Sequence, residues 1–292
     1  MLYNITHITR YFYEQPVSQC LTEARLTPRS FESQDVRELR IVVHPEPADF
    51  GQHKDYFGNQ VTTFSVLQTH DRLTATASSV VEVMPRPDVQ LPTVAWDEVR
   101  ALLQDHRDDE SLRAYEFIFD SPFVTTDARL ADYGRPTFTA GRPLVDAVLE
   151  LSARIHKEFQ YKPKSTSIDI PLVDVLMQRQ GVCQDFAHVM IGVLRSRGLA
   201  ARYVSGYLRS RAQYVGAEAS HAWVAVFVPG YGWLNVDPTN NVIPSDRHIT
   251  LGWGRDFGDV SPVKGITLGG GGQTVNVEVR VDPVESQDEV PR

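Results

Sequence analysis

The sequence predicts an α+β protein, in which an all-β unit precedes a core of helices packed on an antiparallel sheet. Residues 1–84 divide into short segments rich in β-branched and aromatic residues, separated by turn-forming stretches. Residues 143–197 show the apolar spacing typical of helices, and strand-like segments return from residue 201 onwards. Strands and helices that follow one another in separate blocks are typical of α+β folds.

The N-terminal unit, residues 1–84, is expected to be an antiparallel sandwich or a barrel-like sheet. Its strands are predicted in LYNITHITRYFY, LRIVVHPEP, VTTFSVL and LTATASSVVEVM, with turns in TPRS, HPEPADFG and FGNQ. Residues 85–142 are expected to be a connecting segment. It is rich in proline over 85–98 and then carries short helical patterns such as AWDEVRALLQDH.

Residues 143–292 are expected to form the core. Three helices are predicted, over 143–159, 171–181 and 183–197. Four strands are predicted, in ARYVSGYLRS, HAWVAVFVPG, GWLNVDPTN and TVNVEVRVDP. The run Gly269–Gly272 is followed by a strand and lacks the lysine of a phosphate-binding loop, so we interpret it as a flexible loop near the site.

Composition excludes several classes of protein. The 292 residues carry a formal net charge of −8 and no lysine or arginine cluster, which argues against nucleic-acid binding. No apolar run approaches the roughly 18 residues of a membrane span. The first residues lack the basic and apolar regions of a secretory signal, so a cytoplasmic location is expected. Two cysteines, Cys20 and Cys183, suffice neither for a disulfide framework nor for a cysteine-rich zinc site, and no cofactor is expected.

Cys183 stands at the predicted start of a helix whose apolar residues form one stripe: Phe186, Val189, Met190, Val193 and Leu194. Unpaired backbone N–H groups and the helix dipole favour thiolate over thiol at this position. The same N–H groups are suited to stabilising an oxyanion, and Gly181 allows a substrate or backbone to approach closely. The alternative is a buried thiol at the start of a core helix. Cys20 has no helix start or histidine beside it, and we interpret it as a small buried or half-buried apolar residue.

His221 and Asp237 lie on the two arms of a predicted β-hairpin. With its turn at 230–232, the numbers of cross-strand partners should sum to roughly 458–462, and His221 and Asp237 sum to 458, which makes them neighbours. The carboxylate is expected to hold Nδ1–H of the imidazole and to leave Nε2 for a thiol. A surface cross-strand pair is the alternative. A cysteine, a histidine and an aspartate in this order are consistent with a nucleophile, base and orienting acid.

Two segments, GVCQDFAHVMIGVLRSRGLAARYVSGY and HAWVAVFVPGYGWLNVDPTNN, strongly resemble the core of the bacterial transglutaminase-like superfamily. The first 84 residues, with YEQPV, LTPR and DYFGN, resemble the β-rich domain that accompanies this core in one bacterial branch. The resemblance implies a papain-like core with Cys183 as nucleophile, His221 as general base and acid, and Asp237 orienting His221. Asn241 departs from the glycine of many relatives and affects only the local turn.

Five further residues are candidates for supporting roles. The resemblance implies an upstream donor for the oxyanion hole, for which Tyr161 and Gln178 are candidates. Trp223 is interpreted as hairpin packing, with a wall of the substrate groove as the alternative. His188 lies about 140° around the helix from the cysteine, so a structural role is expected. Asp185, in the first helical turn, is expected to cap the helix.

The predicted activity is acyl transfer to the cysteine, acting on a peptide or protein substrate through a thioester. Hydrolysis by a cysteine peptidase or amidase is favoured over amine crosslinking, because no sequence feature selects an amine. The third alternative is a binding or scaffold protein that keeps the fold without activity. Neither a metal nor a nucleic-acid or membrane partner is expected, and the oligomeric state stays open.

Overall fold

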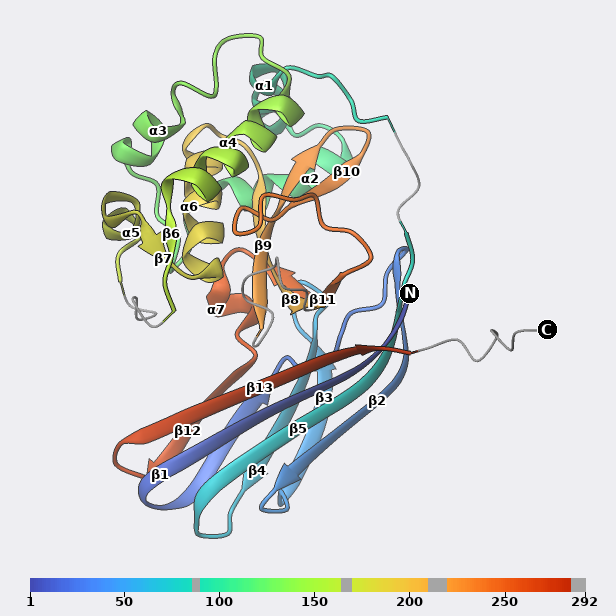
Figure 1. Ribbon diagram of the computed structural model, residues 1–292, viewed down its shortest axis with the longest axis vertical. Helices are drawn as coiled ribbons and strands as arrows, with labels where there is room; N and C mark the ends of the chain where they lie inside the picture. Colours follow the sequence, from blue (N-terminus) through green and yellow to red (C-terminus); the bar gives the residue numbers. More distant parts are fainter. Residues whose placement is uncertain (86–89, 164–169, 210–219, 285–292) are drawn as a thin grey trace, which may run out of the picture.

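The computed structural model describes residues 1–85, 90–163, 170–209 and 220–284. Figure 1 shows a sheet of long strands below a unit in which helices cover a smaller sheet. The predicted α+β class is confirmed. The strands of the larger sheet are β1 (Leu2–Ala24), β2 (Gln34–His44), β3 (Asp49–Lys54), β4 (Gln60–Val66), β5 (His70–Val83), β12 (Val263–Gly269) and β13 (Gln273–Pro283).

β1 is the central strand of the larger sheet, and its two parts pair with different strands. Its first part pairs with β5 on one side and β13 on the other, and its last part pairs with β4 and β12. The register shifts between Phe12 and Val17, where the strand passes from one half to the other. β2 then extends the sheet beyond β5, and β3 extends it beyond β4. Cys20 is free and lies in the apolar core of this unit.

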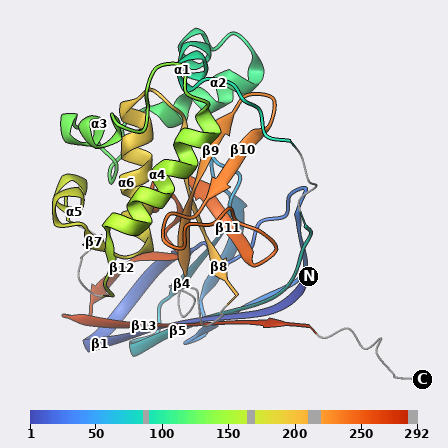
Figure 2. The same cartoon turned by 45° about the horizontal axis from the view of Figure 1, so that its top comes forward.

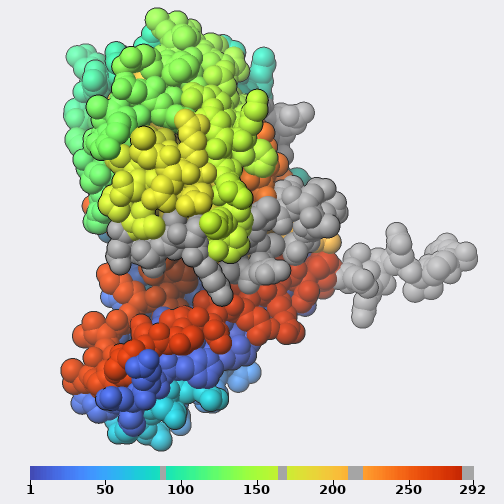
Figure 3. Space-filling model, turned by 60° about the vertical axis from the view of Figure 1, so that its left-hand side comes forward, coloured from blue at the N-terminus to red at the C-terminus, as the bar shows by residue number. Residues whose placement is uncertain are grey.

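The C-terminal strands differ from the sequence prediction. TVNVEVRVDP was expected in the core, but β12 and β13 lie along β1, each antiparallel to it, β12 beside its last part and β13 beside its first part (Figure 3). Gly269–Gly272 links these two strands and accepts hydrogen bonds from the N–H groups of Glu14 and Gln15, so it belongs to the larger sheet and is not a loop near the site. A strand pattern in the sequence does not show which strand is the partner. Here β12 and β13 pair with the side of β1 that β4 and β5 leave open. The division at residues 84 and 142 stays a prediction.

The smaller sheet has the strand order β10-β9-β8-β11. Its strands are β8 (Ala201–Leu208), β9 (His221–Val228), β10 (Gly232–Val236) and β11 (His248–Gly254), of which β11 was not predicted. The helices of this unit are α1 (Trp96–Asp105), α2 (Asp109–Tyr115), α3 (Ala128–Gly134), α4 (Leu144–Glu158), α5 (Leu172–Gln178), α6 (Cys183–Ser196) and α7 (Phe257–Val260), with a 3-10 turn η1 (Glu116–Ile118). Helices α4 and α6 agree with the predicted ranges to within one residue at each end.

α6 is the central helix of the unit. It packs on β8 and β9 on one side and contacts α3, α4 and α5 on the other (Figure 2). Nearly all its side chains are buried, which explains its continuous apolar stripe. α5 ends earlier than predicted, because Arg179 is left-handed and the chain then forms β7 (Gln180–Gly181), parallel to β6 (Gln160–Tyr161). The pairing with β6 fixes the position of β7, and with it the position at which α6 begins.

The two units share an apolar core and a side-chain clamp. The core joins β1, β5 and β13 to β8 and β11; its fully buried members include Tyr3, Val81, Tyr207 and Ile249. The clamp consists of Gln34 and Asn59, whose amides bond the backbone of β11. Among the described residues, no helix combines the length and apolar character needed to cross a bilayer.

Gly206 in β8 lies beside β11, opposite Thr250, and against Trp223. A Cβ atom there would collide with the carbonyl oxygen of Ile249 and the indole of Trp223. Gly206→Ala should therefore lower the free energy of unfolding by roughly 3 kcal/mol or more, measured by urea unfolding. The matched control is Gly230→Ala, where the added atom meets nothing within 4 Å and only the φ of +74° is unfavourable; a loss of about 1 kcal/mol is expected there. Equal losses would contradict the packing argument.

Candidate active site

Cys183 is the first residue of α6, and its side chain is 8% exposed. The helix begins here because Val182 is extended and its N–H donates to Oδ2 of Asp185 at 2.8 Å. Asp185 thus has the capping position that the sequence predicted. A cysteine at this point faces the unpaired N–H groups of the first helical turn.

Gly181 has a different role from the expected one. A Cβ atom at this position would lie 2.5 Å from Oδ2 of Asp185, so it is the capping carboxylate that requires glycine. Gly181 also accepts a hydrogen bond from the N–H of Lys162 at 2.8 Å. The residue therefore fixes the approach of the chain to Cys183, and close approach of a substrate stays a prediction.

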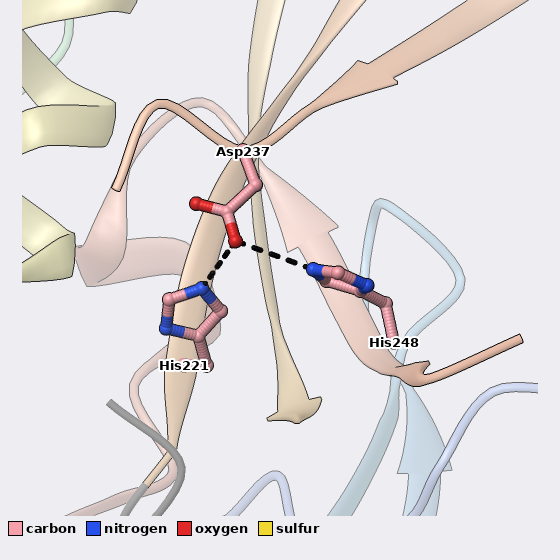
Figure 4. Close-up of side chains that lie close together, drawn as sticks. All are labelled: His221, Asp237 and His248. Carbon is pink, nitrogen blue, oxygen red and sulfur yellow. Dashed lines mark hydrogen bonds and ion pairs between the residues drawn. The ribbon is translucent and has the colours of Figure 1, made fainter. Parts of the chain in front are cut away.

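His221, the first residue of β9, and Asp237, which follows β10, form a fully buried pair. The His221 Nε2 to Asp237 Oδ2 distance is 2.8 Å. The hairpin pairs Val224 with Val236, a sum of 460 that lies in the predicted range. Asp237 is therefore not directly opposite His221 but offset along the strand, and the side chains bridge the offset (Figure 4).

The nitrogen that meets the carboxylate is not the predicted one. Nε2, not Nδ1, bonds Asp237, because the offset places the carboxylate near the far end of the ring. Among the described residues, Nδ1 of His221 has no hydrogen-bond partner. It is therefore the nitrogen available to a thiol, and Cys183 makes a further contribution to the raised pKa of His221.

Asp237 is surrounded by donors. Its Oδ1 accepts from the N–H groups of Thr239 at 2.9 Å and Asn240 at 3.2 Å. Its Oδ2 accepts from His221, from the Asn240 amide at 2.8 Å and from Nε2 of His248 at 3.2 Å. Burial alone would raise the pKa of Asp237, but the charge and hydrogen bond of His221, helped by His248, hold it far below its usual range. The carboxyl group is therefore ionised.

The opposite shift occurs at His221. Burial would lower the pKa of its imidazole, but the charge and hydrogen bond of Asp237, with a further contribution from Cys183, raise it to about 10. At neutral pH the ring is accordingly an imidazolium, with the Asp237 carboxylate at its Nε2.

His248 was missed in the sequence. It is the first residue of β11, whose alternating apolar residues in HITLGWG are a strand signal that was overlooked. Burial lowers the pKa of His248 against the raising effect of Asp237, so this second imidazole is neutral. In Figure 4 the carboxylate of Asp237 lies between the two rings.

Among the residues described by the structure, His221, Asp237 and His248 form the one cluster whose ligand atoms, all within 4.8 Å of one another, could hold a metal ion. Two imidazoles and a carboxylate are a ligand set that zinc accepts. The contacts instead fit hydrogen bonding, because the Asn240 amide donates to the same Oδ2 at 2.8 Å and would lie against an ion there.

Three residues proposed for the oxyanion hole or groove are placed as follows. The ring of Tyr161 packs edge-on against Phe186, and Gln178 is exposed and accepts from Gln180 at 3.2 Å. Their roles stay predictions. Trp223 is 1% exposed and donates to Asn235 at 2.9 Å, so it packs inside the sheet unit and is not an open groove wall.

His188 has a structural environment, as expected from its position on α6. Its Nε2 accepts the N–H of Phe257 at 3.1 Å, and its ring stacks on Phe123. Burial lowers the pKa of His188 to about 4, so the ring is neutral.

Comparisons with known proteins agree with this architecture. Residues 3–82 match the bacterial transglutaminase-like N-terminal region, and residues 132–238 match the transglutaminase-like superfamily. An uncharacterized protein of Mycobacterium tuberculosis (strain H37Rv) is 37% identical, over 97% of this chain and 92% of its own. A protein-glutamine gamma-glutamyltransferase of Pseudomonas aeruginosa is 38% identical over 124 residues, which are 39% of this chain and 18% of that protein.

The fold has a counterpart among solved structures. A crystal structure from Cytophaga hutchinsonii, described as that of a candidate cysteine protease, superposes with a TM-score of 0.78. It covers 98% of this chain and 92% of its own at 18% identity, and so supports the fold alone. Together with the full-length relative, these matches show that the chain belongs to the transglutaminase-like superfamily and carries its bacterial N-terminal region.

Proposed function

We propose that this protein is a thiol-dependent acyl-transfer enzyme that hydrolyses peptide or amide bonds through Cys183, His221 and Asp237. The observation that carries the proposal is the buried Asp237–His221 ion pair, together with Cys183 at a helix start, which contributes to the raised pKa of His221. A charged imidazole beside a thiol stabilises the thiolate, which is the nucleophilic form of cysteine.

In the proposed reaction, the sulfur of Cys183 attacks the carbonyl carbon of an amide, and the carbonyl π bond opens to an oxyanion. N–H groups at the start of α6 are suited to bind that oxyanion. His221 gives the proton on Nδ1 to the leaving nitrogen, the C–N bond breaks, and a thioester and a free amine result. His221 then takes a proton from water as the water attacks the thioester, and Cys183 leaves as thiolate while the acid is released.

Transfer to an amine is the second candidate. It shares the thioester and differs only in the acceptor, and the similarity to the Pseudomonas aeruginosa protein-glutamine gamma-glutamyltransferase favours it. Hydrolysis remains our first choice because water needs no second binding site. A scaffold without activity is the third alternative, and the ionised buried pair argues against it, because such a pair is costly to bury without a use.

Alkylation by iodoacetamide tests for the activated thiol. At pH 6 an ordinary thiol is about 0.3% thiolate, so a thiol paired with His221 should react roughly a hundredfold faster than one that is not. We expect rapid modification of Cys183 at pH 6, followed by mass spectrometry, and a loss of roughly a hundredfold in His221→Ala. Cys20, buried in β1, is the internal control. An ordinary thiol rate for Cys183 at every pH would support the scaffold.

Product analysis separates the two enzymatic candidates. Glutamine-containing peptides are incubated with the protein, with and without a primary amine, and Cys183→Ala is the blank. Hydrolysis predicts cleavage products or ammonia whose yield the amine does not change. Incorporation of the amine at the expense of hydrolysis would reject our first choice in favour of transfer.

The raised pKa of His221 predicts how stability depends on pH. The folded protein binds this proton up to about pH 10, whereas the unfolded chain releases it near pH 6.5. The stabilisation is thus complete below pH 6.5 and is lost as pH rises through about 10. The free energy of unfolding of wild type minus that of His221→Gln should fall by at most about 1.4 kcal/mol per pH unit in this window. Parallel curves from pH 6.5 to 10 would contradict the assignment.

A further inference from the structure

We propose that His248 is a positioning residue of the active site, which holds the carboxylate of Asp237 for His221 and is itself held in place from the N-terminal sheet. The inference rests on the proposed function. It gives roles to two features that the triad leaves unexplained: a second buried imidazole on Asp237, and the clamp on β11.

The geometry gives His248 direct control of the catalytic carboxylate. Its Nε2 lies 3.2 Å from Oδ2 of Asp237, the same oxygen that His221 bonds at 2.8 Å. His248 is 5% exposed, and its ring meets Trp223 edge-on with centroids 5.2 Å apart, so it cannot swing away without disturbing the sheet. A donor on each side of Oδ2 opposes rotation of the carboxylate (Figure 4).

The charge state of His248 suits this role. The charged or titratable groups that act on its ring are Asp237, His221 and Arg247. Burial and the two cationic neighbours lower its pKa, so His248 donates a hydrogen bond as a neutral ring. It thereby fixes the carboxylate without adding a second positive charge, which would compete with His221 for Asp237.

His248 is delivered by β11, which is the edge strand of the smaller sheet next to β8. The exposed edge of such a strand offers unpaired N–H and C=O groups. Gln34 meets those of Thr250: its Oε1 accepts the N–H at 2.8 Å and its Nε2 donates to the carbonyl at 2.8 Å. The side-chain amide thus makes the two hydrogen bonds that a residue of a neighbouring strand would make with Thr250.

Asn59 repeats the arrangement at the other end of β11. Its Oδ1 accepts the N–H of Trp253 at 3.0 Å, and its Nδ2 donates to the Trp253 carbonyl at 2.8 Å. Arg29 donates to the same Oδ1 at 3.0 Å and covers the Trp253 ring at 3.7 Å. The N-terminal unit therefore fixes the strand that carries His248 at two points, which makes this unit part of the catalytic apparatus.

The test uses iodoacetamide alkylation of Cys183 at pH 6 on the full chain. His248→Phe keeps an aromatic ring at this position but removes the N–H donor. The alkylation rate should fall roughly tenfold, which is the equivalent of one hydrogen bond to a charged group. His248→Gln can place an amide N–H near the position of Nε2, and its rate should stay within about threefold of wild type. This rescue by the conservative variant distinguishes positioning from packing.

A second pair of variants tests the clamp. Gln34→Met removes both bonds to Thr250, together with the bond to the Arg29 carbonyl, and should slow alkylation at least threefold. The matched control is Gln52→Met, because Gln52 bonds only Thr62 of its own sheet in the described structure, and its rate should equal that of wild type. Nitrogen-15 NMR of histidine in the wild type should show His248 neutral at pH 7, with its proton on Nε2.

The outcomes separate the two hypotheses. If Cys183 of the wild type reacts like an ordinary thiol, the proposed function fails. If the wild type reacts fast but His248→Phe reacts equally fast, only the positioning role is overturned. Equal slowing in folded Phe and Gln variants of His248 would assign the effect to packing and also overturn it. If His248→Phe does not fold, the alkylation rate of Gln34→Met and the NMR signal of His248 in the wild type test the positioning role. A wild-type rate for Gln34→Met, or a proton on Nδ1 of His248, refutes it.

Discussion

Asp237 carries a negative charge at a position with no solvent exposure, and this buried charge constrains much of the structure around it. An ionised carboxylate inside a protein is tolerated only when donors and an opposite charge replace the lost water. Its five donors come from the start of β9, the turn after β10 and the start of β11. The hairpin register, the course of the chain after β10 and the placement of β11 must all be correct for the charge to be compensated.

Cys183, the proposed nucleophile, is held with comparable rigidity at the start of α6. α6 is buried along nearly its whole length, so its position is set by packing against the sheet and the outer helices. Its C-terminal turn is fixed by Arg195, whose guanidinium donates to the carbonyls of Phe117, Ala201 and Arg255 and to Ser121. At its other end the cap by Asp185 sets where the helix begins. In the proposed reaction, sulfur and imidazole are thus brought together by two rigid layers rather than by loops.

The sequence predicts what is local and misses what is long-range. The start of α6 at Cys183 follows from periodicity, and the β9–β10 register follows from counting residues across a short turn. Which nitrogen of His221 meets Asp237 depends on an offset of the side chains that residue counting cannot resolve. His248 lies in a strand whose partner is set by the tertiary fold. The pairing of β12 and β13 with β1, some 250 residues away, has no local signal at all.

In the proposed reaction, the burial of Asp237 and of the His221 nitrogen that it bonds bears on how hydrolysis and transfer would compete. Nε2 of His221 is occupied by Asp237, which has no exposed surface, so any proton that His221 exchanges with a substrate must pass through Nδ1. In the proposed reaction, the departing amine and the incoming acceptor therefore use the same face of the imidazole in succession. Water and an amine compete for the space that the leaving group vacates, while Cys183, His221 and Asp237 act identically in both reactions. It follows that the residues lining this space, rather than the triad, determine which acceptor resolves the thioester.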